Sequence, residues 1–242
     1  MEILSALLKL MPKEPVPVRK VLVGVHWVLV CSQHCGLAST LVNVEPHGHS
    51  RVRDVGMLHQ KSAQELAGWV LLDNLLEASL GMAALNSLLE VEESRLEQVN
   101  AEEVIKEKGE GKHVVIVGHF PFIERIKSGM QSCRVIEKQP FGDDFPEEAA
   151  REFIPRAQVV AITGTAFINH TMEGLLSLCR SDASVLVLGP STPLAPQLFK
   201  FGISFLSGAR VIDEEAAWLT IQQGAMFQQV KGVKLVTMKK DA

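Results

Sequence analysis

VVIVGHFPF (114–122), VVAITGTAFINHT (159–171) and VLVLGPSTPLAP (185–196) share one pattern, an apolar run that ends in glycine and continues into a loop of small, polar or proline residues. Apolar runs of this length, separated by helix-like stretches, are typical of buried strands in a parallel sheet. Ligands of open α/β sheets bind outside the carboxyl ends of the strands, so we expect the three loops to line one common crevice. The candidate ligand-binding residues in these loops are Gly118, Phe120, Pro121, Gly164, Thr165, Asn169, Gly189, Pro190, Ser191 and Thr192.

The second half of the chain alternates strand-like segments with helical or loop segments. This alternation predicts a Rossmann-like domain with a mostly parallel sheet. The strand-like runs fall at about 113–117, 132–137, 158–163, 185–189, 209–212 and 233–238.

The first half has a different pattern. Residues 1–11 have helical spacing, and the segments 18–31 and 37–45 predict two paired antiparallel strands. Residues 62–93 then predict two helices, the second rich in small residues such as Gly81 that would let it approach a neighbour closely. This half is therefore expected to be a small α+β domain.

A segment dense in Glu and Lys, 90–112, separates the two halves, and we interpret it as a solvated helix end and connector. The domain boundary is placed there. The predicted division is an α+β domain at 1–108 and a Rossmann-like domain at 109–242. The predicted fold class of the whole chain is α/β.

Composition narrows the class of partner. The 242-residue chain has a net charge of −4 and no long basic stripe, which argues against nucleic-acid binding. The longest apolar stretch, 21–31, is shorter than the roughly 20 residues that span a bilayer. Four cysteines and an acidic residue at position 2 favour a reducing cytoplasm over secretion. Small molecules are the expected partners. The sequence does not decide whether the chain forms a homo-oligomer.

The first loop and the strand after it suggest a phosphate or nucleotide site. Pro121 suits the first turn of a helix, whose N-terminus would favour an anion, although Gly118 and Pro121 would equally shape a tight turn. Glu137 ends the second strand, where Rossmann sheets often hold an acid that contacts ribose, but it is also readable as a surface glutamate. Because no GxGxxG motif follows the first strand, a nicotinamide site is not predicted.

The second loop is crowded with polar groups. Thr165, Asn169, His170 and Thr171 follow a buried strand within a few residues of one another. Buried polar groups need partners, so the cluster either contacts a ligand or caps the next helix, with Asn169 or Thr171 as the cap.

Two histidines of the predicted crevice, His119 and His170, are the candidates for proton transfer. Together with Asp144 or Asp213 they would form a metal site only if the fold brings them together.

Three further residues offer metal-binding donors. Cys31, His34 and Cys35 lie close together, but this spacing lacks the second ligand pair of a structural zinc site. A transition metal therefore stays open as a cofactor, with no ligands assigned.

Several ordered motifs resemble the family described as a "putative heavy-metal chelation" domain. The resemblance covers residues 110–242 and, through EASLGMAALNSLL, extends to the companion N-terminal domain of that family, which is similar to the enolase N-terminal domain. The motifs are GHFPF, the segment 137–140, ITGTAFINHT, LGPSTPLAP and FGISFLSGARVID.

The resemblance implies an enolase N-terminal-like α+β domain followed by a Rossmann-like domain, with a cleft between them. His119 and His170 fall inside the matching motifs, whereas Cys31 and Cys35 do not. Asn86, from the first domain, is expected to reach into the cleft.

Three functions follow from these observations. The first is an enzyme that binds a polar or anionic, chelator-like molecule and performs condensation, hydrolysis or group transfer in the synthesis of a metal chelator or a pterin- or flavin-like cofactor. The alternative is a protein without turnover that sequesters a transition metal or a metal chelate. A methyltransferase-like nucleotide site, suggested by Glu137, is the third.

Overall fold

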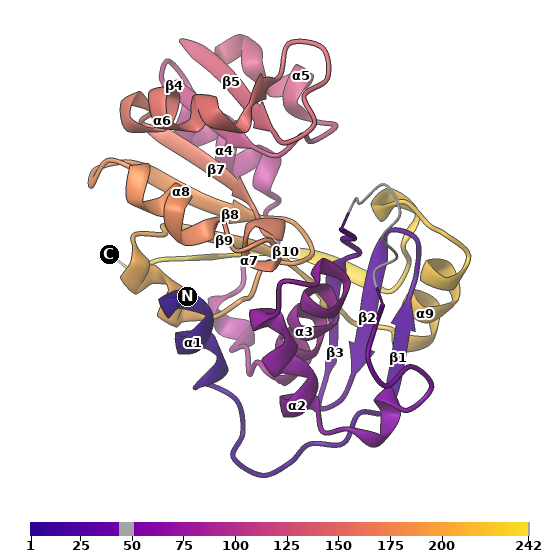
Figure 1. The fold of residues 1–242 in the computed structure, drawn as a ribbon. Coiled ribbons are helices and arrows are strands. Elements are labelled where there is room, and N and C mark those ends of the chain that lie inside the picture. Colours follow the sequence, from indigo (N-terminus) through magenta and orange to yellow (C-terminus); the bar gives the residue numbers. More distant parts are fainter. Residues whose placement is uncertain (44–50, 242) are drawn as a thin grey trace.

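A computed structural model describes residues 1–43 and 51–241 of the protein. It contains two sheets (Figure 1), a three-stranded antiparallel sheet in the order β1-β2-β3 and a seven-stranded sheet in the order β10-β9-β8-β7-β4-β5-β6. The α/β class and the mostly parallel main sheet are confirmed. No helix in the described part of the chain is long and apolar enough to cross a bilayer.

The small sheet and its helices come from residues 2–88. Its elements are α1 (Glu2–Leu8), β1 (Lys20–Val23), β2 (Trp27–Cys31), β3 (Cys35–Ser39), α2 (Ala63–Ala67) and α3 (Leu75–Leu88). The segment 18–31 was predicted as one strand but forms two, because the backbone N–H of Gly24 bonds the carbonyl of Trp27 at 2.9 Å and closes a turn between them. Residues 44 and 45, at the end of the segment expected as the second strand, lie outside the described residues.

The large sheet has the strand order of a doubly wound fold. Its strands are β4 (His113–Val117), β5 (Ser132–Glu137), β6 (Phe145–Pro146), β7 (Val159–Thr163), β8 (Ser184–Leu188), β9 (Phe205–Val211) and β10 (Val233–Lys239). All neighbours pair in parallel except β9 and β10. The order reverses between β4 and β7, which is where such sheets bind ligands.

The helices of the second half cover both faces of this sheet. The covering helices are α4 (Ala101–Gly109), α5 (Ile123–Ile126), α6 (Ala150–Phe153), α7 (Thr165–Ile168) and α8 (Met172–Leu178). The last helix of this half, α9 (Glu214–Gln222), packs on the small sheet instead. The interpretation of 90–112 as a solvated connector was wrong for its second part, since α4 buries Val104 and Ile105 against one face of the sheet.

Each half of the chain contributes an element that packs against the other half (Figure 1). α9, near the end of the chain, packs Ala217 and Ile221 on Leu29 and Leu37 of the small sheet, on the side away from α3. At the other end of the chain, the Ile3 backbone N–H donates to Glu173 of α8 at 2.8 Å. One hydrophobic core therefore runs through both halves. The division at 108/109 stays a prediction.

Candidate functional site

A cavity of about 930 Å³ opens where the strand order reverses, at the carboxyl ends of β4, β5 and β7. We call it the edge cavity. Seven of the predicted site residues line it: Gly118, His119, Phe120, Glu137, Thr165, Asn169 and His170. Its other walls come from Leu41, from α6 and from α8.

His119 is held at the edge cavity by a buried carboxylate. Its Nδ1 lies 2.9 Å from Oδ2 and 3.2 Å from Oδ1 of Asp144. The Asp144 side chain is only 5% exposed, whereas that of His119 is 51% exposed. Because Nδ1 faces the carboxylate, Nε2 on the opposite side of the ring is left for a ligand. Of the two acids considered from the sequence, Asp144 joins a histidine, while Asp213 caps α9 through the Ala216 N–H.

Glu137 fixes the loop that carries His119. Its two carboxylate oxygens accept hydrogen bonds from the backbone N–H groups of His119, at 3.0 Å, and Lys138, at 2.8 Å. Gly118 has φ +103°, and a Cβ there would lie 3.0 Å from Cβ of Thr163, so the turn requires glycine. Glu137 thus shapes the loop between β4 and α5, beyond the two roles expected from the sequence.

The expected anion site at the next helix is not supported. α5 is a single turn of four residues with Phe122 at its N-cap, and Pro121 does not line the edge cavity. A helix of one turn has too few aligned peptide dipoles to act as the predicted anion site.

The polar cluster after β7 is partly satisfied within itself. Asn169 Oδ1 accepts hydrogen bonds from the N–H of Thr171, at 3.2 Å, and from its hydroxyl, at 2.7 Å, at the start of α8. His170, with φ +61°, places Nε2 2.8 Å from the carbonyl of Val70. His170 therefore joins the two halves of the chain. Of these two candidate histidines, His119 is the one whose Nδ1 is oriented by a side chain and whose Nε2 is left for a ligand.

The third predicted loop does not join the edge cavity, so the expectation of one common crevice was wrong. Ser191 is buried and accepts a hydrogen bond from the Ser39 N–H at 2.8 Å, which draws the loop after β8 toward the small sheet. Gly164 lies against this loop, because a Cβ added to it would be only 2.8 Å from the backbone N of Thr192. Gly189 and Pro190 line neither of the two cavities described.

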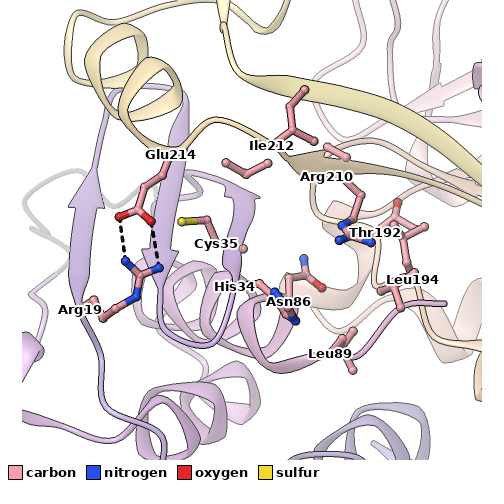
Figure 2. Close-up of a pocket in the computed structure, with 14 residues that line it drawn as sticks. Arg19, His34, Cys35, Asn86, Leu89, Thr192, Leu194, Arg210, Ile212 and Glu214 are labelled. Atoms are coloured by element: carbon pink, nitrogen blue, oxygen red, sulfur yellow. Dashed lines mark hydrogen bonds and ion pairs between the residues drawn. The ribbon is translucent and has the colours of Figure 1, made fainter. Parts of the chain in front are cut away.

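Thr192 and Asn86 instead line a second cavity of about 240 Å³ between the two sheets (Figure 2), which we call the interdomain cavity. Asn86 donates its Nδ2 to the Leu37 carbonyl at 3.1 Å. Asn86 Oδ1 and Thr192 Oγ1 are buried and have no hydrogen-bond partner among residues 1–43 and 51–241. The nearby Arg210 forms an ion pair with Glu93 at 3.0 Å. This cavity therefore offers polar groups from both halves of the chain.

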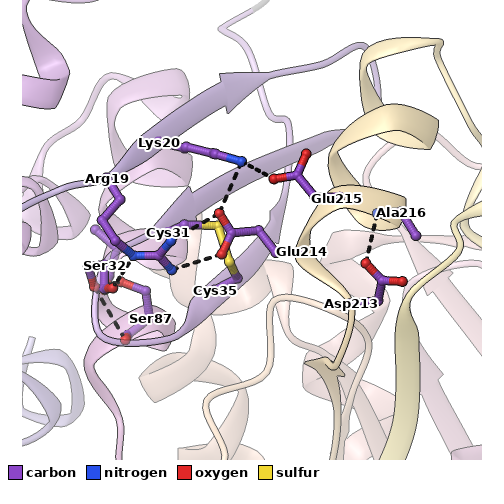
Figure 3. Close-up of a disulfide and its surroundings, with 11 residues drawn as sticks. Arg19, Lys20, Cys31, Ser32, Cys35, Ser87, Asp213, Glu214, Glu215 and Ala216 are labelled. Atoms are coloured by element: carbon purple, nitrogen blue, oxygen red, sulfur yellow. Dashed lines mark hydrogen bonds and ion pairs between the residues drawn. A yellow bond between two sulfur atoms is a disulfide. The ribbon is translucent and has the colours of Figure 1, made fainter.

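A disulfide joins Cys31 and Cys35 beside the interdomain cavity (Figure 3). The bond was not predicted from the sequence. Cys133 and Cys179 are free thiols. Burial raises the pKa of both, and that of Cys179 reaches about 11.

We expect Cys179 to resist alkylation in the folded protein. With a pKa of about 11 against the ordinary 9.0, its thiolate fraction at pH 8 falls roughly a hundredfold, and the thiolate is the reactive form. Iodoacetamide labelling followed by peptide mass spectrometry measures this rate, with urea-unfolded protein as the control. Equal labelling rates in the folded and unfolded protein would contradict the expectation.

Three comparisons place the chain among known proteins. The model of the family DUF364, described as "putative heavy-metal chelation", matches residues 100–239, and that of DUF4213, with the same description, matches residues 5–89. An uncharacterised protein of Methanocaldococcus jannaschii is 26% identical over 84% of this chain and 81% of its own length.

Two crystal structures have the same fold. Both are of proteins with unknown function from the DUF364 family. The one from Desulfitobacterium hafniense superposes with a TM-score of 0.86 and 27% identity, covering 99% of this chain and 98% of that one. The one from Pyrococcus horikoshii superposes with a TM-score of 0.80 and 18% identity, with 98% of each chain covered. The chain therefore belongs to the DUF364 family, described as "putative heavy-metal chelation".

Proposed function

We propose that the protein is an enzyme that binds a small polar molecule in the edge cavity and uses His119 to transfer a proton. The observation that carries the proposal is the buried Asp144 carboxylate behind His119, at the point where the order of the parallel strands reverses. A histidine held on one side by a carboxylate presents its second nitrogen in a fixed direction, as general acid–base chemistry requires.

The lining of the edge cavity suggests the kind of molecule. Leu41, Val117 and Leu175 give it apolar walls, and the rings of Phe120 and Phe122 stack at 5.4 Å. A volume of about 930 Å³ suits a drug-sized molecule. A flat heterocycle with polar edges, such as a pterin- or flavin-like ring, matches apolar walls with a polar rim.

The rim carries charges of both signs. Lys138 is paired with Glu147 at 3.7 Å, while Arg151 has no ion-pair partner in the described part of the chain. Arg151 would meet an anionic group of the bound molecule, and the neighbouring Glu148 would accept hydrogen bonds from its donors.

The family description, "putative heavy-metal chelation", suggests a ligand that is related to metals. We infer that the bound molecule is a metal chelator or its precursor, and that the reaction is a condensation, hydrolysis or group transfer. Each of these reactions moves a proton to or from an attacking or leaving group, which is the role assigned to His119.

The test is turnover of defined compounds. The purified protein would be incubated with pteridines, flavins and heterocyclic carboxylic acids, and consumption followed by liquid chromatography and mass spectrometry. For any compound consumed, we expect His119→Gln to slow turnover by about 10²- to 10⁴-fold, the usual contribution of a general acid or base. Asp144→Asn should slow it as well, because the amide no longer fixes the ring. His59→Gln, at an exposed histidine outside the edge cavity, is the matched control and should leave the rate unchanged.

Two results would contradict the proposal. Turnover that survives His119→Gln unchanged would remove the proposed role of His119. Retention of a compound in native mass spectrometry without its consumption would favour the alternative of a binding protein without turnover.

A further inference from the structure

The structure adds a third donor to the cysteine pair, which the sequence left without enough ligands for a metal. Glu214, the first residue of α9, lies beside Cys31 and Cys35 (Figure 3). One oxygen of Glu214 and the two sulfur atoms all lie within 4.8 Å of one another. Glu214 is about 180 residues away along the chain, so only the packing of α9 on the small sheet brings it there.

The protein scaffold holds the two cysteines in place independently of their mutual bond. Cys31 and Cys35 are opposite each other in the β2–β3 ladder, at the end of a short hairpin. The hairpin loop is anchored to α3, because the Ser32 and Ser87 hydroxyls lie 2.6 Å apart and the His34 N–H donates to the Ser87 carbonyl at 3.0 Å. After reduction of the disulfide the two sulfur atoms therefore stay neighbours.

Two cationic side chains hold the third donor. Arg19 Nη2 lies 2.9 Å from Oε2 of Glu214, and Lys20 Nζ lies 3.3 Å from its Oε1. These contacts hold the carboxylate in place beside the two sulfur atoms. Lys20 and Arg19 also offset the negative charge that two thiolates would add beside it.

We propose that Cys31, Cys35 and Glu214 form a redox-gated binding site for a thiophilic divalent cation such as Zn²⁺ or Cd²⁺. Two thiolates and one carboxylate are ligands of tetrahedral sites that keep one position open. In such a site the two sulfurs would lie about 3.8 Å apart. The open position would face the interdomain cavity, which Cys35 and Glu214 line.

The gate is the disulfide itself. A dithiol reductant transfers two electrons and two protons to the Cys31–Cys35 bond, giving two thiols and becoming a cyclic disulfide. Binding of the cation then releases the two thiol protons and leaves two metal–thiolate bonds and one metal–carboxylate bond. In the oxidised form neither sulfur can act as a thiolate ligand, so the site is closed. The proposal is independent of the chemistry at His119.

The experiment is a cadmium titration of one protein in two redox states. Reduced protein, freed of dithiothreitol without oxygen, should bind one Cd²⁺ per chain and develop the ultraviolet thiolate-to-cadmium charge-transfer band. The oxidised protein, checked by intact mass, should show no such band. An excess of Zn²⁺ should remove it. A reduced protein without the band, or an oxidised protein with the same band, would overturn the proposal.

Variants identify the ligands. Cys31→Ser and Cys35→Ser should each abolish the band, whereas the double variant Cys133→Ser/Cys179→Ser should keep it, since those free thiols lie elsewhere. Glu214→Gln should weaken cadmium binding at least tenfold. Glu215→Gln is its matched control, because that neighbouring carboxylate pairs with Lys20 and is not among the three gathered donors. Equal cadmium affinity of the Glu214→Gln and Glu215→Gln variants would exclude Glu214 as a ligand.

Discussion

Gly81→Ala is expected to destabilise the protein by more than about 3 kcal/mol, the upper end of the usual cost of overpacking. Helix propensity alone predicts the opposite sign. Alanine in the interior of a helix is favoured over glycine by about 1 kcal/mol, and Gly81 lies in the middle of α3. The expected result therefore tells which of the two effects dominates at this position.

Close packing of two backbones decides the sign. A Cβ on Gly81 would lie 2.1 Å from the backbone N and 2.8 Å from Cα of Val70, in the 3₁₀ helix Gly68–Leu71. Contacts this short cannot be relieved by rotating a side chain, because the neighbouring atoms belong to the main chain. The two helical segments would have to move apart, which would loosen the close-packed core in which α3 buries Leu80 and Met82.

The measurement is the midpoint of thermal unfolding, with Gly68→Ala as the matched control. Gly68 is also helical, with φ −58° and ψ −23°, but a Cβ there meets nothing within 4 Å. Gly68→Ala should therefore leave the midpoint unchanged or raise it slightly. If both variants unfold at the wild-type temperature, the close approach of α3 to Val70 is not as tight as the structure has it.

The close approach of α3 was foreseen because its small residues are visible in the sequence. The strand His113–Val117 was predicted with the correct bounds for a similar reason, since a buried parallel strand is a nearly continuous apolar run. The bounds of Ser132–Glu137 were also correct, although that strand is only partly buried. These features depend on residues that are neighbours along the chain, which is the information that a pattern contains.

Strand β9 shows where that information ends. It was expected at 209–212 but begins at Phe205. The prediction began too late because Ser207 and Gly208 interrupt the apolar run in the sequence. In the sheet, the Ser207 hydroxyl lies 2.7 Å from that of Thr237 on β10, so its polar group is satisfied by a residue 30 positions away. A pattern of single residues does not contain such a pairing.

The candidate sites were predictable only in part for the same reason. His119 and Glu137 were singled out because they lie at or just after the carboxyl ends of strands of the parallel sheet. The partnership of His119 with Asp144, and that of Cys31 and Cys35 with Glu214, depend on how the loops and α9 return to the sheets. Residue type identified the candidates, and tertiary packing decided which of them became neighbours.

Phe167→Ala is expected to cost about 3–5 kcal/mol, the usual range for truncating a buried phenylalanine. Phe167 lies in the second predicted ligand loop, yet it is 1% exposed and is among the largest fully buried side chains of the described residues. Its helix, α7, contacts α3 of the first half and leads directly to Asn169 and His170 of the edge cavity. The ring thus supports both the junction of the halves and one wall of the site.

Because the core is continuous through both halves, we expect one unfolding transition, and the substitution should shift the temperature of that whole transition. For a chain of this length the expected loss corresponds to a fall in the unfolding midpoint of roughly 6–20 °C. Phe141→Ala is the matched control, since Phe141 is 82% exposed and its truncation should change stability by no more than about 0.5 kcal/mol. If Phe167→Ala and Phe141→Ala had equal midpoints, Phe167 would not be part of the core that joins the two halves. A large difference between the two would mean that the polar residues of this loop are held in position by the apolar ones between them.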